Sequence, residues 1–270
     1  MKKKFHKFIG IIILMISMVS CAKKDSDSND NTSSSKSLFV TVGESGTILT
    51  SPEGTSWDNR TSGTLEDLVG VTYGNGTFVT VGESGTILTS PEGTSWDNRT
   101  SGTSELLNEV TYGNGTFVTV GNSGSILTST DGTSWTERTS GTSNNLIGVT
   151  NKNGLFVTVG YSGSILTSTD GTSWTERTSG TSKELYGVTY GNGVFVTVGG
   201  FGKILTSSDG TSWTERTSGT SNNLIGVTNK NGLFVTVGYS GTILTSSNGT
   251  SWTQRTSGTS NNLIGVTYSQ

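Results

Sequence analysis

The 270-residue chain has very few of the residues that perform chemistry or interrupt β-structure: one cysteine, one histidine and two prolines. The single cysteine, Cys21, has no partner for an intrachain disulfide. The single histidine, His6, lies near the start, so the rest of the chain has none for a catalytic triad or a usual zinc site. Pro52 and Pro91 both enter expected turns, where proline removes no needed ladder donor. We therefore expect no metal, no cofactor and no enzyme of these classes.

After residue 36 the chain also lacks a helical period and an excess of positive charge. Residues 37–270 contain 10 lysines and arginines against 17 acidic residues, which gives a formal charge of −7. Nucleic acids and anionic lipid surfaces both select clustered positive charge. We therefore expect neither a nucleic-acid partner nor direct contact between this part of the chain and a membrane.

The first 36 residues divide into two segments that we place outside the fold. Residues 1–21 combine a basic start with an apolar run, Phe8–Val19, that is too short to span a bilayer, which is the layout of a secretory signal peptide. Residues 22–36 contain no large apolar side chain and are expected to form a flexible tether.

The signal ends in Met18-Val19-Ser20-Cys21, which resembles a bacterial lipobox, with methionine in place of the usual leucine. The resemblance implies cleavage before Cys21 and lipid attachment to its sulfur. Because Ala22, not aspartate, follows, it also implies the outer membrane if the host has two membranes. The expectation is a secreted protein in the cell envelope whose only membrane contact is the lipid.

Tryptophan recurs six times at intervals of 39 residues, at positions 57, 96, 135, 174, 213 and 252. One period contains four short β-prone runs, at 146–151, 155–160, 164–168 and 174–178, which we call strands A to D. Asn-Gly pairs such as Asn153-Gly154 separate A from B and supply the positive φ that tight hairpins require. Strands A to C are apolar on both faces, whereas D is polar apart from its tryptophan.

A four-stranded sheet that is buried on both faces and exposed to solvent at its outer strand is typical of a propeller blade. The alternative, an open solenoid, would need atypical polar caps, and the terminal repeats resemble the middle ones. Residues 37–270 begin at a strand B and end after a strand A, at 263–268. The sequence therefore predicts an all-β, six-bladed β-propeller with four antiparallel strands per blade, closed by pairing of the C-terminal strand with the first blade.

The C–D turns, Ser129–Trp135 and its copies, resemble the Asp-box of bacterial neuraminidase-type repeats, and the preceding FVTVGxSGxILTS resembles photosystem II stability/assembly factor-like propellers. The resemblance covers all six repeats, although glutamate or asparagine replaces the aspartate in three. We expect a structural role for the box, with the carboxylate accepting turn amides and the tryptophan covering the joint between blades. The residues concerned are Asp131, Trp135, Asp170, Trp174, Asp209 and Trp213.

Sialidases share this box, and the resemblance implies that they need arginines that converge at the ring centre. Here every arginine of the repeats stands three residues after the tryptophan, at one rim position. We expect each to pair with a nearby carboxylate such as Asp58 or Glu137 as a solvated ion pair. Glycosidase chemistry by paired carboxylates stays open in principle, but we expect no carboxylate to interrupt the repeat on an inner strand.

The repeats differ from one another mainly in the B–C and D–A loops, which a propeller places on one face. We predict that this face carries any binding function, with aromatic anchors and amides suited to a glycan or a protein partner; drift of solvent loops is the alternative. The candidate residues are Glu44, Glu83, Asn122, Tyr161, Tyr239, Phe201 and Lys203 in the B–C turns and Asn144, Asn145, Asn222 and Asn223 in the D–A loops.

The predicted function is therefore a monomeric lipoprotein that displays a propeller as a binding module for an unknown protein or glycan. A structural or assembly factor in the envelope is the alternative that the family resemblance implies. A glycan-acting hydrolase is the third hypothesis.

Overall fold

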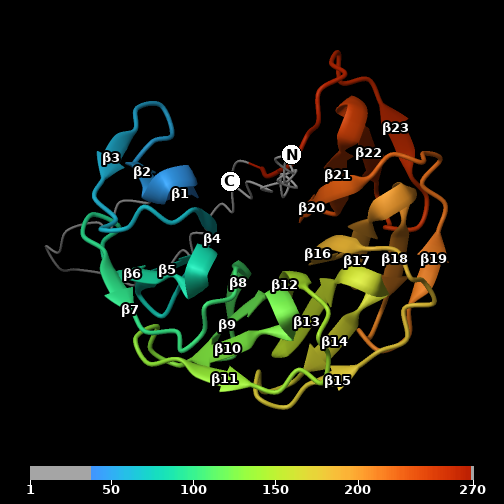
Figure 1. The fold of residues 1–270 in the computed structure, drawn as a ribbon. Helices are drawn as coiled ribbons and strands as arrows, with labels where there is room; N and C mark the ends of the chain where they lie inside the picture. The colour runs from blue at the N-terminus through green and yellow to red at the C-terminus, as the bar shows by residue number, and fades with distance from the viewer. Residues whose placement is uncertain (1–37, 269–270) are drawn as a thin grey trace, which may run out of the picture.

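The structure, a computed structural model, describes residues 38–268, which form 23 strands and six one-turn 3-10 helices in six antiparallel sheets. The sheets stand like spokes around a common centre (Figure 1). The six predicted blades are confirmed. The predicted signal peptide, tether and lipidation site lie outside the described residues. Among the described residues, no helix has the length and apolar character needed to cross a membrane.

Each blade runs in chain order from its inner strand to its outer strand. Blade 1 contains β1 (Phe39–Gly43), β2 (Thr47–Ser51) and β3 (Asp58–Arg60); blade 2 contains β4 (Leu68–Gly74), β5 (Thr77–Gly82), β6 (Ile87–Ser90) and β7 (Asp97–Arg99); blade 3 contains β8 (Leu107–Gly113), β9 (Thr116–Gly121), β10 (Ile126–Ser129) and β11 (Thr136–Arg138). Blade 4 contains β12 (Leu146–Lys152), β13 (Leu155–Gly160), β14 (Ile165–Ser168) and β15 (Thr175–Glu176); blade 5 contains β16 (Leu185–Gly191), β17 (Val194–Gly199), β18 (Ile204–Ser207) and β19 (Thr214–Arg216); blade 6 contains β20 (Leu224–Lys230), β21 (Leu233–Gly238), β22 (Ile243–Ser246) and β23 (Thr253–Arg255).

A one-turn helix forms each B–C turn, which joins the second and third strands of a full blade. These helices are η1 (Glu44–Gly46), η2 (Glu83–Gly85), η3 (Asn122–Gly124), η4 (Tyr161–Gly163), η5 (Gly200–Gly202) and η6 (Tyr239–Gly241). The A–B turns have the predicted left-handed residues, as in Asn153 (φ 50°) and Gly154 (φ 86°). Turn chemistry therefore fixes the hairpin register within each blade.

The hydrophobic core lies between neighbouring blades because the inner strands are apolar on both faces. In one joint, Val118 and Val120 of blade 3 pack with Leu146 and Phe156 of blade 4 in a fully buried cluster. Equivalent clusters fill the other joints from blade 1 through blade 6. Burial of such side chains stabilises by roughly 1.5–3 kcal/mol each, so most of the stability comes from contacts between blades.

The predicted closure of the ring is wrong in this structure. The first sheet has three strands, and no strand of the described chain pairs with the free edge of β1. Residues 263–268 form no strand and stay with blade 6, where Leu263 N donates to Gly238 O at 3.0 Å and a Cβ on Gly226 would lie 2.8 Å from Ile264 O. The segment therefore takes the next inner position after β20, and Figure 1 shows the opening that separates blade 6 from blade 1.

This opening leaves apolar surface at the joint between blades 1 and 6. Trp57 of blade 1 is 40% exposed, whereas its counterpart Trp96, which packs against blade 1, is 9% exposed. On the other side of the opening Leu233 of blade 6 is 47% exposed. No described residue covers these two faces in the way that the neighbouring blade covers the same positions in the other joints.

Candidate binding face and central channel

The B–C turns and D–A loops lie together, because they are hydrogen-bonded to each other. Ser123 N, in the B–C turn of blade 3, donates to Asn145 Oδ1 in the loop that leads to blade 4, at 3.0 Å. Phe201 N donates to Asn223 Oδ1 at 3.0 Å in the same way, two blades further along. The two variable loop sets therefore form one surface, which we call the variable face.

The asparagines that the sequence suggested as ligand contacts are occupied by bonds within the protein. Besides the two acceptors just described, Asn144 Nδ2 donates to Ser164 Oγ and Asn222 Nδ2 donates to Thr242 Oγ1, both at 2.9 Å. These side chains hold the turn and the loop together, which favours a structural role for them.

Three tyrosines gather on the variable face of blades 4 to 6, and we call Tyr161, Tyr186 and Tyr239 the tyrosine cluster. The rings of Tyr161 and Tyr186 meet edge to face with centroids 6.4 Å apart. Burial, together with the charge of Glu184, raises the pKa of Tyr161 and raises that of Tyr186 to about 12, and Tyr239 contributes to both. Tyr161 is 40% exposed, so the cluster presents aromatic surface to solvent beside a carboxylate.

Tyr186 was not among the predicted site residues, although the sequence carried a signal for it. It stands on β16 where the equivalent residues of three other inner strands, at 147, 225 and 264, are isoleucine. An aromatic side chain with a hydroxyl replaces an aliphatic one at the place where the inner strand begins. Comparison of inner strands, not only of loops, would have found it.

Phe201, the third predicted aromatic, occupies a left-handed turn position (φ 57°) that serine fills in the other repeats. Its ring is 64% exposed, and Lys183 Nζ lies 4.2 Å from the ring centroid. The predicted neighbour Lys203 instead pairs with Glu215, at 2.5 Å between Nζ and Oε1. This aromatic surface already accepts an ammonium group of the protein itself.

The first two blades give the variable face an acidic side. Glu44 is exposed, and Ser45 N beside it donates to Asp67 Oδ1 at 2.8 Å. Burial raises the pKa of Glu83, and the charges of Asp67 and Glu66 raise it further. In blade 3, predicted candidate Asn122 accepts a hydrogen bond at 3.2 Å from Asn108 Nδ2. The face thus combines an aromatic part over blades 4 to 6 with an acidic part over blades 1 and 2.

A carboxylate, Glu109, interrupts the repeat on the inner strand β8, contrary to our expectation. The equivalent position is glycine in every other repeat, at 70, 148, 187, 226 and 265. The register between β8 and β9 shifts between Leu107 and Glu109, and Thr119 Oγ1 donates to the Glu109 carbonyl at 2.9 Å. A bulge re-aims side chains locally, so this backbone places Glu109 toward the ring centre.

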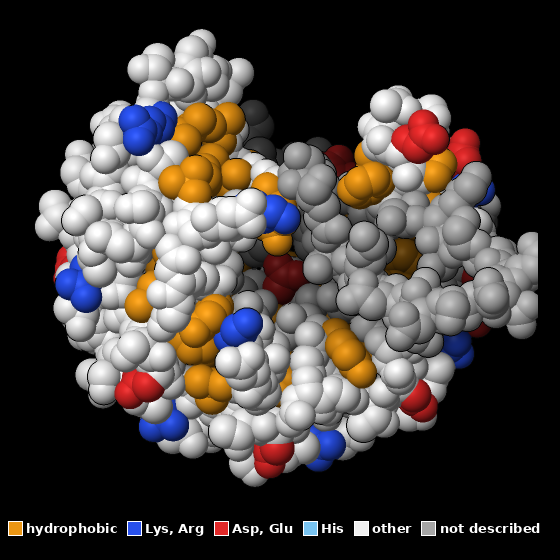
Figure 2. All heavy atoms as spheres, turned by 180° about the vertical axis from the view of Figure 1, so that it is seen from behind, with side chains coloured by type: hydrophobic (Ala, Val, Ile, Leu, Met, Phe, Trp, Pro, Cys, Tyr) orange, Lys and Arg blue, Asp and Glu red, His pale blue; other side chains and the backbone are white. Residues whose placement is uncertain are grey.

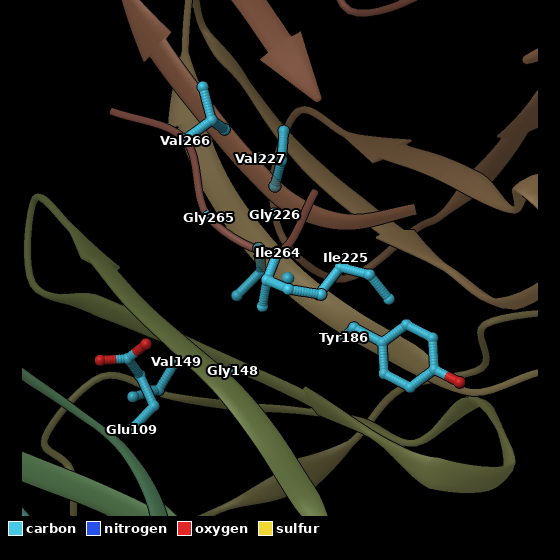
Figure 3. A pocket seen from close by; sticks show the side chains of 12 residues that line it. Glu109, Gly148, Val149, Tyr186, Ile225, Gly226, Val227, Ile264, Gly265 and Val266 are labelled. Atoms are coloured by element: carbon cyan, nitrogen blue, oxygen red, sulfur yellow. The ribbon is translucent and has the colours of Figure 1, made fainter. Parts of the chain in front are cut away.

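The inner strands enclose a cavity of about 130 Å³ that Glu109, Tyr186 and the glycines of β12, β16 and β20 line. Figure 2 shows acidic atoms deep in the hollow at the centre of the ring. In Figure 3 the Glu109 carboxylate extends into the cavity, while the Tyr186 hydroxyl points away from it. Burial raises the pKa of Glu109 to about 8, and a hydrogen bond from Val110 N, at 3.1 Å, offsets only part of this effect.

The turn residues that recur in the repeats, the Asp-box aspartates and tryptophans, make hydrogen bonds within their own blades. Asp131 Oδ1 accepts from Thr133 N at 2.7 Å and from Ser134 N at 3.0 Å, which holds its pKa well below the usual range. Asp170 and Asp209 make the same bonds. Trp135 Nε1 donates to Gly132 O at 2.9 Å, and Trp174 and Trp213 repeat this contact; these three rings pack into the clusters between blades.

The rim arginines have a different common partner from the one expected. Each donates from Nε to a threonine hydroxyl of the third strand of its blade, as Arg138 does to Thr128 at 2.8 Å. Ion pairs join Arg60 to Asp58 and Arg99 to Asp97 at 3.0 Å, whereas the expected pair with Glu137 is not among the ion pairs of the described residues. Within residues 38–268, no cluster of three potential His, Cys, Asp or Glu ligands could hold a metal ion.

No protein-family model and no curated protein matches the chain. Among solved structures, YCF48 bound to D1 peptide is 19% identical, with a TM-score of 0.67 over 90% of this chain and 81% of that one. YCF48 from Cyanidioschyzon merolae is 15% identical, with a TM-score of 0.62 over 81% and 80%. The computationally designed Ika8 protein is 13% identical, with a TM-score of 0.70 over 86% and 75%. The predicted resemblance to photosystem II assembly factor-like propellers is thereby confirmed as a likeness of fold.

Proposed function

We propose that this protein is a non-enzymatic binding module that takes a segment of a partner protein on its variable face. The observation that carries the proposal is the tyrosine cluster, which offers partly exposed aromatic surface in three neighbouring positions. Aromatic side chains of this kind are enriched among the residues that contribute most of the binding energy at protein interfaces. The YCF48 structure with a bound D1 peptide supports a protein partner, because a propeller of similar fold binds a peptide.

A protein partner suits this face better than a glycan. Sugar hydroxyls are recognised by free polar groups beside aromatic rings, and the amides of this face are engaged in bonds between its own loops. The acidic part over blades 1 and 2 adds a preference for a partner segment that combines apolar and basic residues.

Hydrolysis of glycans has weaker support. Paired-carboxylate hydrolysis needs two carboxyl groups flanking one bond. Glu109 is the only acidic residue among those that line the central cavity. A structural or assembly role in the envelope remains compatible with binding, because an assembly factor also acts by holding a partner.

We further propose that the module is displayed at the cell envelope by lipid attached to Cys21, on the outer membrane if the host has two. The support is the sequence of residues 1–21 and the short polar segment 22–36 that would separate the lipid from the propeller. We propose a monomer, with the variable face free for its partner.

A random-peptide display library, selected on the full purified chain, tests the binding proposal. The tyrosines of the cluster are replaced by residues that other repeats already carry there: Tyr161→Asn, Tyr239→Asn and Tyr186→Ile. The control is Tyr73→Asn, because Tyr73 ends β4 at an A–B turn, is 39% exposed, and has asparagine at the equivalent positions 151 and 229.

We expect the selected peptides to lose about tenfold or more in affinity with each cluster variant and to keep it with the control. Tenfold corresponds to roughly 1.4 kcal/mol, a modest effect for an aromatic anchor. The variable face would be rejected as the binding surface if the selected peptides lose as much affinity with the control variant as with the cluster variants, or if the cluster variants leave their affinity unchanged. Selective binding of a glycan array through the same tyrosines would replace the protein partner by a sugar.

A further inference from the structure

The inner strands of this propeller leave no room for most side chains at the position of Glu109. A Cβ added to Gly187 or Gly226 would lie 2.8 Å from a carbonyl oxygen of the next inner strand, and one added to Gly148 would lie at 3.0 Å. Glycine therefore suits this position wherever the strands only pack together. A glutamate that replaces it, with its side chain extended into the cavity, is not explained by packing (Figure 3).

Among the described residues that line the cavity, none offers this carboxylate a charged partner. Its lining contains glycines, aliphatic side chains and Tyr186, with no lysine or arginine. Val110 N, in the backbone of the adjacent residue, donates a hydrogen bond to Glu109 Oε1. Ionisation of a carboxyl group in such surroundings is unfavourable in free energy, and a cation that binds beside it would stabilise the ionised form.

The cavity is connected to the variable face through one residue. Tyr186 lines the cavity, and its ring also meets that of Tyr161 of the tyrosine cluster edge to face. Glu184 lies two residues before Tyr186, just ahead of β16, and its charge raises the pKa of both tyrosines. The two tyrosine rings and the Glu184 carboxylate therefore lie between the variable face and Glu109, and both kinds of group attract cations.

We propose that the central cavity binds one ammonium or guanidinium group as an ion pair with Glu109. This group would be the end of a lysine or arginine side chain of the partner segment. This inference rests on the proposed function, because it names the residue type that the partner inserts. A cavity of about 130 Å³ has room for the end of one such side chain and not for a folded element. A metal ion would need several more oxygen ligands than one carboxylate supplies.

The probe is the methylamide of Nα-acetylated lysine, compared with the norleucine analogue, which has the same apolar stem and no charge. Binding to the full chain is followed by the ¹³C resonance of the side-chain carboxyl groups of glutamate, with the Glu109 signal assigned by its loss in Glu109→Gly. That variant restores the residue of the other five repeats, so it is expected to fold. Glu109→Gln keeps the shape and removes the charge, and Glu83→Gln on the acidic part of the face is the matched control.

We expect the lysine probe to shift the Glu109 resonance, to lose about tenfold or more in affinity with either Glu109 variant, and to keep its affinity with Glu83→Gln. The affinity should rise with pH by up to roughly tenfold per unit below the pKa of the free site, because an ammonium pairs only with the ionised carboxylate. Tyr186 is the only other titratable residue of the lining, and its pKa of about 12 keeps it neutral in this range.

Equal binding of the norleucine probe, or a lysine affinity that both Glu109 variants leave unchanged, would overturn the inference. Its failure is distinguishable from failure of the proposed function. If selected peptides depend on Tyr161 and Tyr239 but not on Glu109 or on a basic residue of their own, only the channel site is rejected. If no peptide depends on the tyrosines, the small probe still reports on the channel.

Discussion

Removal of the charge at Glu109 should change how the stability of the propeller depends on pH. A native pKa of about 8, compared with ~4.3 for an unfolded glutamate, means that the native state binds more protons than the unfolded state between these values. The free energy of unfolding therefore falls as the pH rises through this window. The full difference corresponds to roughly 4–5 kcal/mol, and water that reaches part of the side chain in the channel reduces it to about 3 kcal/mol.

Thermal or denaturant unfolding of the wild-type chain, Glu109→Gln and Glu109→Gly between pH 5 and pH 9 measures this effect. At pH 5, just above the pKa of an unfolded glutamate, the Gln variant should exceed the wild type in stability by no more than about 1 kcal/mol, and at pH 9 by about 3 kcal/mol, or roughly 6–12 °C in Tm for a domain of this size. Other titrating groups, Glu83 included, contribute equally to both proteins and cancel in the difference. A difference that stays flat from pH 5 to pH 9 would refute a buried, unpaired carboxylate at this position.

Three further predictions concern the joint, the turns and the anchor. Trp135→Ala should lower the free energy of unfolding by about 3 kcal/mol or more. Trp57→Ala should lower it by less than half of that, because the Trp57 ring borders the opening between blades 1 and 6. Equal losses for the two variants in a denaturant titration would show that blade 6 packs against Trp57. Asp131→Ala should cost about 1–2 kcal/mol, whereas Asp131→Asn should cost less, because Asn248 makes the same turn bonds in blade 6. Because the native pKa of Asp131 lies well below its usual range, the wild-type advantage over Asp131→Ala should begin to fall only below about pH 4 and should disappear only below that native pKa; an advantage that is the same at pH 5 and pH 2 would contradict this. Cys21→Ser should abolish incorporation of a labelled fatty acid into the protein in growing cells, and retained label would place the lipid elsewhere.

The repeat made much of the architecture readable in advance. A spacing of 39 residues between tryptophans, Asn-Gly pairs at the hairpins and apolar faces on three strands predicted six blades and the approximate positions of the four strands in a repeat. For example, the expected run at 155–160 is β13 (Leu155–Gly160). These features are local or periodic and recur in each repeat. A strand that is ambiguous in one repeat can therefore be assigned from the equivalent residues of the other repeats.

The candidate site was harder to read because it lies where the repeats disagree. The aromatic residues of the B–C turns were visible as loop variation, and the structure places Tyr161 beside Tyr186. Glu109 was also visible as the one exception to a row of glycines, but its importance depends on the inner strands standing side by side. Residues 39 or more positions apart share the channel, and no local pattern reports that proximity.

The sequence alone determined the blade, its turns and the number of blades, because hydrogen bonding and side-chain alternation within 39 residues are enough to specify them. The tertiary structure decided two things that depend on contacts between distant segments. It kept residues 263–268 on the glycine surface of β20, so that within residues 38–268 no strand pairs with the free edge of β1. It also placed Glu109 beside four other inner segments whose described lining residues carry no positive charge, which turns a single substitution in a repeat into a candidate site for a cation.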